Sequence, residues 1–287
     1  MKHILLCSDG SNFSKTSYSY AGWLAPRLNA EVDVLFVSDI RSQKVASTGN
    51  YSGAIGLDAS RELLNKLVEL EHQKAKINHE KAQLVLQDAK QQLQEAGVSA
   101  IKVIHETGFL VDIFHRFEVE SDLIILGKRG EAADFASDHL GSNMERIARA
   151  SHKPCLITPR DYKPIQRLLL AYDGSNSCQK MLDFLVRSQA FKGLELHIIS
   201  VAKNTDDETA MANLKVAQMQ AQSVGFQPKC ELISGIPEKA IAQYIEAHDI
   251  SLLLMGAYGH SRIRHLVIGS TTMQLLRSSS IPVLLFR

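Results

Sequence analysis

A glycine-rich segment near the end of the chain has the residue types and spacing to hold a phosphate group. It reads Gly256-Ala-Tyr-Gly259, then nine residues, then Gly269-Ser270-Thr271-Thr272. Glycine lets the backbone approach a ligand closely and adopt positive φ. A helix that begins at Gly269 would present unpaired amides and the positive end of its dipole to an anion, and the neighbouring hydroxyls would add donors.

The residues between these glycines favour an anion in the same way. They include Arg262, Arg264, His260 and His265, and no acidic residue. The competing interpretation is that the segment holds ordinary turn and cap glycines, since glycine commonly marks turns after strands.

A second candidate group is the tetrapeptide Asp-Gly-Ser-Asn, which occurs identically at Asp9 and at Asp173. Its carboxylate could accept a hydrogen bond from an adenine amino group or a ribose hydroxyl. An Asp followed by Gly-Ser at a strand-to-helix turn is equally a good helix cap. Recurrence favours neither interpretation, because a cap would recur as well.

The chain repeats itself, and the repeat places both groups in a common frame. The Asp-Gly-Ser-Asn turn recurs at an offset of 164, DLIILGKRG matches SLLLMGAYG at an offset of 129, and Gly141 aligns with Gly269. The sequence therefore predicts two homologous domains, 1–160 and 164–287, joined by the polar turn from Pro159 to Pro164.

Within each half, short apolar runs alternate with amphipathic stretches of helical spacing, which is typical of a parallel sheet buried on both faces. The runs are 3–8, 31–37, 99–105, 122–126 and 154–158, then 167–172, 194–201, 228–233, 250–255 and 281–286. The pattern predicts an α/β protein of two tandem Rossmann-like domains, each with a five-stranded parallel sheet flanked by helices. Such sheets bind ligands where strand order reverses, and Asp173 and Gly256 end the two strands that flank this point.

The halves differ in the second crossover, where residues 41–97 form a long insertion in the first half. It begins with a Ser/Gly-rich stretch and continues into a Gln/Lys/Glu-rich helix from Arg61 to Ala96. Leu70, Ile77 and Leu84 lie seven apart, as in a coiled coil, but the companion positions are polar. One or two long helices lying over the sheet are therefore expected.

Composition excludes several classes of protein. The net charge of +1 provides no electrostatic basis for a nucleic-acid partner, and no apolar run approaches the ~20 residues that cross a bilayer. The four cysteines form no CxxC pair or His cluster, so a reducing cytoplasm without a structural metal is expected. Walker, GxGxxG and GxSxG motifs are missing, and no catalytic residue is assigned.

Across essentially its whole length the chain resembles the universal stress protein family in its tandem form. ATP-binding members carry G-x2-G-x9-G-[ST] after the fourth strand, and the second half matches this spacing without a gap. The resemblance implies an adenine nucleotide alpha-hydrolase-like fold, binding of ATP, a regulatory role in stress survival and weak hydrolysis at most. Any Mg²⁺ is expected to accompany ATP through its phosphates. The implied binding residues are Ala171, Tyr172, Asp173, Val201, Met255, Gly256, Tyr258, Gly259, Gly269, Ser270, Thr271 and Thr272.

The first half departs from this pattern. Ten residues rather than nine separate Gly130 from Gly141, and Glu131, Asp134 and Asp138 make the loop acidic. We expect the insertion to displace the amides around Gly141, and a degenerate site there. The corresponding candidates are Asp9, Val37, Gly127, Gly130, Gly141 and Ser142.

Two other functions remain open at this point. One is a nucleotide-free interaction module, and the other is a weak hydrolase of the PP-loop kind, whose double glycine is absent from the Asp-Gly-Ser-Asn turn. The two halves are expected to pair internally as a pseudo-dimer through edge strands, which protects those edges from aggregation. Pairing of whole chains into a homodimer is left open.

Overall fold

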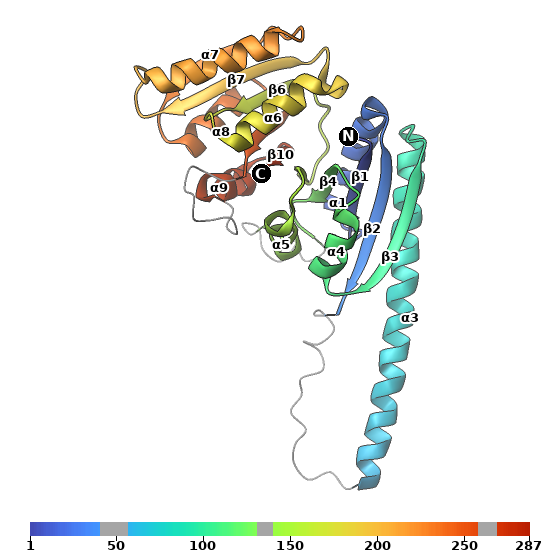
Figure 1. Cartoon of the computed structure of the whole chain (residues 1–287). Coiled ribbons are helices and arrows are strands. Elements are labelled where there is room, and N and C mark those ends of the chain that lie inside the picture. Colours follow the sequence, from blue (N-terminus) through green and yellow to red (C-terminus); the bar gives the residue numbers. More distant parts are fainter. Residues whose placement is uncertain (41–56, 131–139, 258–268) are drawn as a thin grey trace.

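A computed structural model describes residues 1–40, 57–130, 140–257 and 269–287, with the backbone alone over 57–64. It has two halves of alternating strands and helices (Figure 1). The first half contains β1 (His3–Ser8), α1 (Asn12–Leu28), β2 (Glu31–Asp39), α3 (Leu57–Glu95), β3 (Ile101–Gly108), α4 (Leu110–Glu118), β4 (Leu123–Gly127), α5 (Ser142–Ala150) and β5 (Cys155–Thr158). The second contains β6 (Arg167–Ala171), α6 (Asn176–Arg187), β7 (Glu195–Ala202), α7 (Glu208–Gln222), β8 (Lys229–Ser234), α8 (Pro237–Ala247), β9 (Leu252–Gly256), α9 (Ser270–Ser278) and β10 (Val283–Phe286). All ten predicted strands are present, with ends shifted by at most three residues. The edge strands β3 and β8 contain no buried residue, so the expected burial on both faces is wrong for these two.

The ten strands form one continuous sheet in the order β3-β2-β1-β4-β5-β10-β9-β6-β7-β8. Neighbours within each half are parallel, whereas β5 and β10 pair antiparallel, with Leu156 opposite Leu284. The halves thus join through their edge strands, as the predicted internal pseudo-dimer requires. Neither β5 nor β10 keeps an unpaired edge along the paired residues.

Helices cover both faces of the sheet because its strands are apolar on both sides. One core contains Tyr18 of α1, Leu86 of α3 and Met181 of α6. The other contains Phe114 of α4, Ile147 of α5 and further residues of α8 and α9. The parallel βαβ connections place the carboxyl ends of β1 and β4, and of β6 and β9, side by side. These are the two points of strand-order reversal where open α/β sheets hold ligands.

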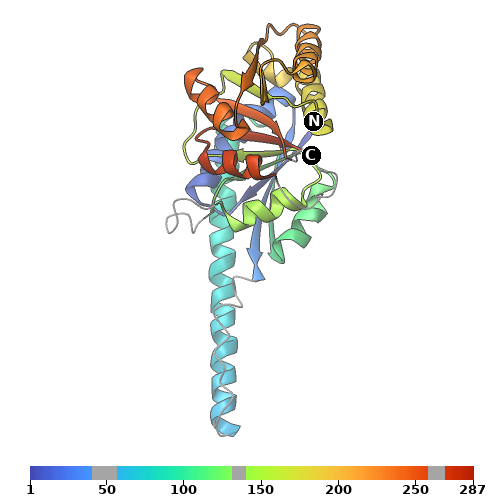
Figure 2. The same ribbon diagram turned by 90° about the vertical axis from the view of Figure 1, so that its left-hand side faces the viewer.

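The described part of the insertion forms one continuous helix, α3, of which only the carboxyl-terminal part lies over the sheet. Ala82, Leu86, Ala89 and Leu93 are buried there, while the amino-terminal part projects clear of the body (Figures 1 and 2). The expectation of a helix lying over the sheet is therefore correct for the second part and wrong for the first. Thirty-nine residues span about 58 Å at 1.5 Å per residue, whereas the eight residues of β3 span about 26 Å.

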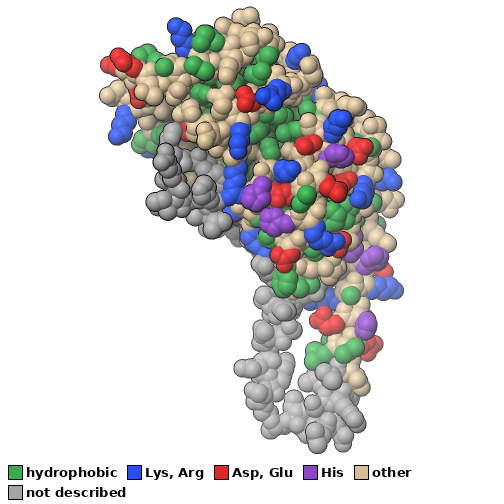
Figure 3. All heavy atoms as spheres, in the orientation of Figure 1, with side chains coloured by type: hydrophobic (Ala, Val, Ile, Leu, Met, Phe, Trp, Pro, Cys, Tyr) green, Lys and Arg blue, Asp and Glu red, His purple; other side chains and the backbone are tan. Residues whose placement is uncertain are grey.

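The projecting part of α3 carries exposed apolar side chains (Figure 3). They are Leu67, Val68, Leu70 and Ile77, and Leu84 continues the row beside the packed part. Elsewhere on the face that Figure 3 presents, acidic and basic side chains are interspersed, in keeping with the net charge of +1. The Ser/Gly-rich stretch at 47–56 lies outside the described residues.

Candidate functional site

The turn after β6 is built around Asp173. Its Oδ1 accepts a hydrogen bond from the Ser175 amide at 2.9 Å, and Gly174 between them adopts a φ of +75°. Ser175 is the N-cap of α6, where its side chain accepts from the Cys178 amide. The helix-cap interpretation of Asp173 is thus replaced by a more specific one, since the serine caps the helix and the aspartate orders the turn. Asp173 itself is exposed at the carboxyl edge of the sheet.

Three more predicted residues lie at this edge. Ala171 pairs in register with Met255 on the adjacent strand β9. Ala171 and Val201 both pack against the core that α8 and α9 cover. The side chains of these residues therefore line one face of the sheet beside Asp173. Gly256 follows Met255 and ends β9.

The side chain of Tyr172 does not join this group. It is 4% exposed, belongs to the opposite core, and donates its hydroxyl hydrogen to Gln179 Oε1 at 3.0 Å. Side chains alternate across a strand, so neighbours of Ala171 point to the other face. Only the backbone of Tyr172 remains available to a ligand.

The glycine turn after β9 closes onto the start of α9. The Gly269 amide donates to the Ala257 carbonyl at 3.1 Å, and Ala257 donates to Phe286 at 2.7 Å. Gly269 is the N-cap and offers no side-chain cap, which leaves the first amides of α9 to other partners. This end of the helix is the arrangement that suits an anion.

The hydroxyl groups of Ser270, Thr271 and Thr272 around this turn differ in burial and in hydrogen bonding. Thr272 is buried, and its hydroxyl donates to the Gly256 carbonyl at 3.2 Å, which corrects its expected role as a phosphate donor. The Thr271 hydroxyl donates to Glu238 Oε2 at 3.4 Å, whereas Ser270 is exposed. Tyr258, Gly259 and the Arg/His loop at 260–265 lie outside the described residues.

The Cys178 thiol borders the same turn. Burial raises its pKa to about 12, and the nearby Asp173 carboxylate acts in the same direction. The thiol is therefore neutral at physiological pH, and its Sγ donates to the Ala171 carbonyl. It serves as a small buried group rather than a nucleophile.

The equivalent turn in the first half is occupied by its own side chains. Asp9 Oδ1 accepts from the Ser11 amide at 3.0 Å and from the Ser14 hydroxyl at 2.7 Å. Asp9 Oδ2 lies so close to Gly130 that a Cβ there would be 2.5 Å away. Val85 of α3 lies equally close to the left-handed Gly10. Asp9 is thus held by its own turn and packed against the glycine segment.

The one-residue insertion does not displace Gly141, contrary to expectation. Its amide donates to the Lys128 carbonyl at 3.0 Å, which is the same closure that Gly269 makes with Ala257. Gly141 caps α5 without a side-chain bond, and Ser142 is exposed at the first helical position. The extra residue therefore falls between Gly130 and Gly141. Most of that interval, including Glu131, Asp134 and Asp138, lies outside the described residues.

An ion pair bridges the carboxyl end of β2 and α5 in the first half. Arg146 lies 3.5 Å from Asp39 and also donates to Asn143 Oδ1 at 3.3 Å. By the repeat offsets, these positions are Lys203 and Gln274 in the second half, which cannot form this pair. Val37 lies two residues before Asp39 on the same strand and packs against the same core as α5. Sequence reasoning missed this bridge, for which comparison of the repeats was the available signal.

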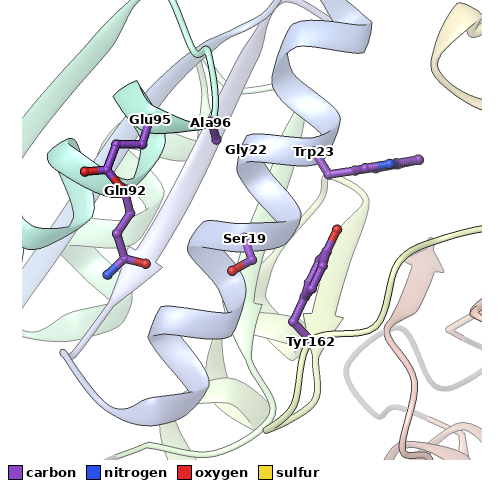
Figure 4. Close-up of a pocket in the computed structure, with 7 residues that line it drawn as sticks. All are labelled: Ser19, Gly22, Trp23, Gln92, Glu95, Ala96 and Tyr162. Atoms are coloured by element: carbon purple, nitrogen blue, oxygen red, sulfur yellow. The ribbon is translucent and has the colours of Figure 1, made fainter.

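A separate pocket lies between α1, α3 and the connection of the halves (Figure 4). Trp23 and Tyr162 border it on one side and Gln92 and Glu95 on the other. The polar groups are engaged along α3, since Gln92 donates to Asp88 and Glu95 accepts from Gln91. Trp23 lies near the carboxyl end of α1, far along the helix from the Asp9 turn, so this pocket is distinct from the predicted site.

Two further findings concern the part of the chain that the structure describes. It contains no group of three or more His, Cys, Asp or Glu residues placed to hold a metal ion. None of its helices combines the length and apolarity that crossing a bilayer requires.

Together the fold and the edge of β6 and β9 define a tandem α/β protein of the Rossmann-like class. The chain belongs to the universal stress protein family, whose model matches residues 1–159 and 164–287. The universal stress protein Slr1230 of Synechocystis sp. is 55% identical over 287 residues, 100% of both chains.

Two more distant relatives match the chain over different lengths. A solved universal stress protein from Archaeoglobus fulgidus is 26% identical, covers 99% of this chain and 98% of its own, and aligns with a TM-score of 0.71. The universal stress protein MJ0577 of Methanocaldococcus jannaschii is 27% identical over 85 residues, which are 30% of this chain and 52% of that protein.

Proposed function

We propose that this protein binds ATP in its second half and acts as a cytoplasmic regulatory protein in the stress response. The observation that carries the proposal is the amino end of α9. Gly269 caps it without a side chain, beside Asp173 and Gly256 at the point where strand order reverses. Backbone amides at such a helix end, in a positive dipole field, are suited to phosphate oxygens.

Different residues contact different parts of the ATP molecule in this proposal. Ala171, Val201 and Met255 provide apolar contact for the base, and the Asp173 carboxylate accepts from the base or the ribose. Gly256, Gly259 and Gly269, with Ser270, hold the phosphates. Tyr258, Tyr172, Thr271 and Thr272 contribute through their backbone or the outer wall of the site. Any Mg²⁺ is carried by the phosphates rather than by a protein cage.

Hydrolysis of the bound ATP is expected to be slow. The described carboxylates near this edge are already engaged, since Asp173 accepts from the Ser175 amide and Glu238 accepts from the Thr271 hydroxyl. Dedicated enzymes commonly turn over at about 10 s⁻¹. Steady-state turnover near that rate would contradict the regulatory assignment and favour the hydrolase alternative.

The first half is proposed to be a degenerate site. Asp9 is engaged by Ser11 and Ser14, and the Asp39–Arg146 pair links β2 to α5 across the same edge. The expected acidic loop would add repulsion toward phosphates.

A matched pair of substitutions tests this assignment. Ser270 and Ser142 are both exposed first residues of equivalent helices, so glutamate at either is compatible with folding and with the helix dipole. We expect S270E to weaken ATP binding about tenfold or more, because a carboxylate meets the phosphates. S142E should leave it within about twofold of wild type, as measured by calorimetry.

Two other outcomes have defined meanings. An S142E effect larger than that of S270E would move the principal site to the first half. If the purified protein carries no nucleotide by mass spectrometry and takes up none after soaking with ATP, the interaction module becomes the better function. The exposed apolar row on α3 would then be the surface to examine first.

A further inference from the structure

Lys128 crosses from the first half into the second. It lies in the glycine turn of the first half, directly after Gly127, and is 9% exposed. Its Nζ donates to the carbonyls of Arg277 at 2.5 Å and Ser279 at 3.0 Å. Those carbonyls belong to the carboxyl end of α9, the helix whose amino end forms the proposed phosphate site.

The carboxyl end of a helix is where a buried cation finds compensation. The last carbonyls of a helix have no intrahelical partner and carry the negative end of its dipole. Lys128 is buried, so it has lost solvation, and this burial, with Arg129 nearby, lowers its pKa to about 8. The two carbonyls replace that solvation with charge-assisted hydrogen bonds.

The contact has a counterpart with the halves exchanged. Arg287 donates to the carbonyls of Arg149 at 3.3 Å and Ser151 at 3.0 Å, at the carboxyl end of α5. With the repeat offset of 128, Arg149 and Ser151 are the equivalents of Arg277 and Ser279. Each helix that follows a glycine turn is therefore held at its far end by a cation of the other half.

The two cations come from different places in the repeat. The residue equivalent to Lys128 is Ala257, whose side chain is too short to reach the other half. The backbones of the two residues are alike, since each amide donates to a carbonyl of the last strand of its own half, Lys128 to Thr158 and Ala257 to Phe286. The residue equivalent to Arg287 is Pro159. Only α9 is thus held from within the other half's glycine turn.

We propose that Lys128 is a positioning residue for the nucleotide site of the second half. It holds α9 by its carboxyl end and so fixes the amides at the amino end against Gly256 and Asp173. The nine residues of α9 span about 13 Å and transmit the constraint as a rigid unit. On this assignment the degenerate turn of the first half serves as the support of the other half's site. The inference rests on the proposed binding of ATP in the second half.

The test compares K128M with R287M in the full chain. K128M removes the ammonium and keeps the apolar stem, and R287M removes the equivalent cation from α5. K128M should weaken ATP binding about 3- to 30-fold by calorimetry, the range of couplings carried through packed elements. R287M should leave ATP affinity within about twofold of wild type.

Hydrogen exchange of the nucleotide-free protein provides a second readout. In K128M the Met273 amide, which donates to the Gly269 carbonyl in the first turn of α9, should exchange faster than in wild type. R287M should accelerate exchange in α5 instead. K128Q serves the same comparison if K128M does not fold.

Each remaining outcome decides the matter. Wild-type ATP affinity in K128M would overturn the positioning role, as would equal losses in K128M and R287M, which would indicate general weakening of the interface. If the wild-type protein binds no ATP, the proposed function fails on its own. The role of Lys128 is then judged by exchange at Met273, where an unchanged rate overturns it and a faster rate supports it.

Discussion

The turns after β1 and β6 have the same four residues and different surroundings. In the first half, Ser14 donates to Asp9, and Asp9 packs against Gly130. In the second half, the position of Ser14 is Cys178, whose thiol donates to the Ala171 carbonyl, while Asp173 accepts from the Ser175 amide. One hydroxyl-to-thiol difference therefore accompanies the change from an aspartate built into its turn to one exposed at the sheet edge.

This comparison teaches that a repeated motif does not fix the side chains that surround it. The glycine turns close identically, with Gly141 on Lys128 and Gly269 on Ala257. What differs is the second layer of side chains: the Asp39–Arg146 pair has no counterpart, and the left-handed glycine contacts Val85 in the first half and Asn213 in the second. The backbone of the turn is retained in both halves, whereas the side chains around it differ.

The largest effect we expect concerns the helices that connect the second and third strands of each half, α3 in the first half and the shorter α7 in the second. Leu93 of α3 is 0% exposed, in the part of the helix that packs on the sheet, whereas Leu84 of the same helix is 69% exposed. Leu93→Ala should lower the free energy of unfolding by about 2–5 kcal/mol through the cavity it leaves. Leu84→Ala should change it by less than about 0.5 kcal/mol. Urea denaturation measures both.

A large loss from Leu84→Ala would mean that the exposed row is covered in solution. The surface that covers the row would then lie outside the contacts described above. A urea denaturation midpoint that depends on protein concentration would identify that surface as a second chain.

The next effect separates the two aspartates. Asp173→Ala should weaken ATP binding by about tenfold to a hundredfold, since a hydrogen bond to a charged group contributes about 1.5–3 kcal/mol. Asp9→Ala should leave ATP affinity near the wild-type value. It should instead lower stability by about 1–2 kcal/mol, because Ser11 and Ser14 lose their acceptor.

Calorimetry and thermal unfolding on both variants complete this test. If Asp9→Ala costs ATP affinity and Asp173→Ala costs only stability, the two halves have exchanged the roles assigned to them.

The smallest effect compares equivalent positions on β2 and β7, which are Asp33 and His197. Burial lowers the pKa of His197, near Glu195, Lys229, Tyr244 and His248. Its folded pKa lies below the ordinary 6.5, so its neutral form is favoured by folding. Stability from this group is complete above pH 6.5 and is lost as pH falls below it.

Asp33 should act with the opposite sign. Burial raises the pKa of Asp33 above 3.8, so folding favours its protonated form. The stability contributed by this group is therefore lost as pH rises from 3.8 through the raised pKa of the folded state. His197→Gln should flatten the loss of stability below pH 6.5, and Asp33→Asn should flatten the change at lower pH. Urea midpoints as a function of pH distinguish them, and unchanged profiles would show that neither group contributes. The pKa of Glu195 is lowered to about 2 by hydrogen bonds from Lys229 and His197, so it stays ionised through the histidine window.

Much of the fold could be read from the sequence because the determining signals are local. Ten apolar runs predict ten strands, and the eight inner strands contain buried residues as such runs require, whereas the edge strands β3 and β8 do not. The repeat offsets predict two halves, and the glycines of the second half predict a phosphate-binding turn. The alternation of side chains along β6 also predicts that the Tyr172 side chain lies on the face opposite Ala171, where the structure places it.

The tertiary structure decided what depends on residues far apart in the chain. The pairing of β5 with β10, the Asp39–Arg146 bridge and the reach of Lys128 to Arg277 join segments separated by roughly a hundred residues or more. No periodicity or spacing encodes such contacts, because each depends on the distance and burial that only the packed sheet creates. The sequence by itself determined the elements and the repeated turns, and their packing determined which aspartate is exposed at the sheet edge and which is engaged by the side chains of its own turn.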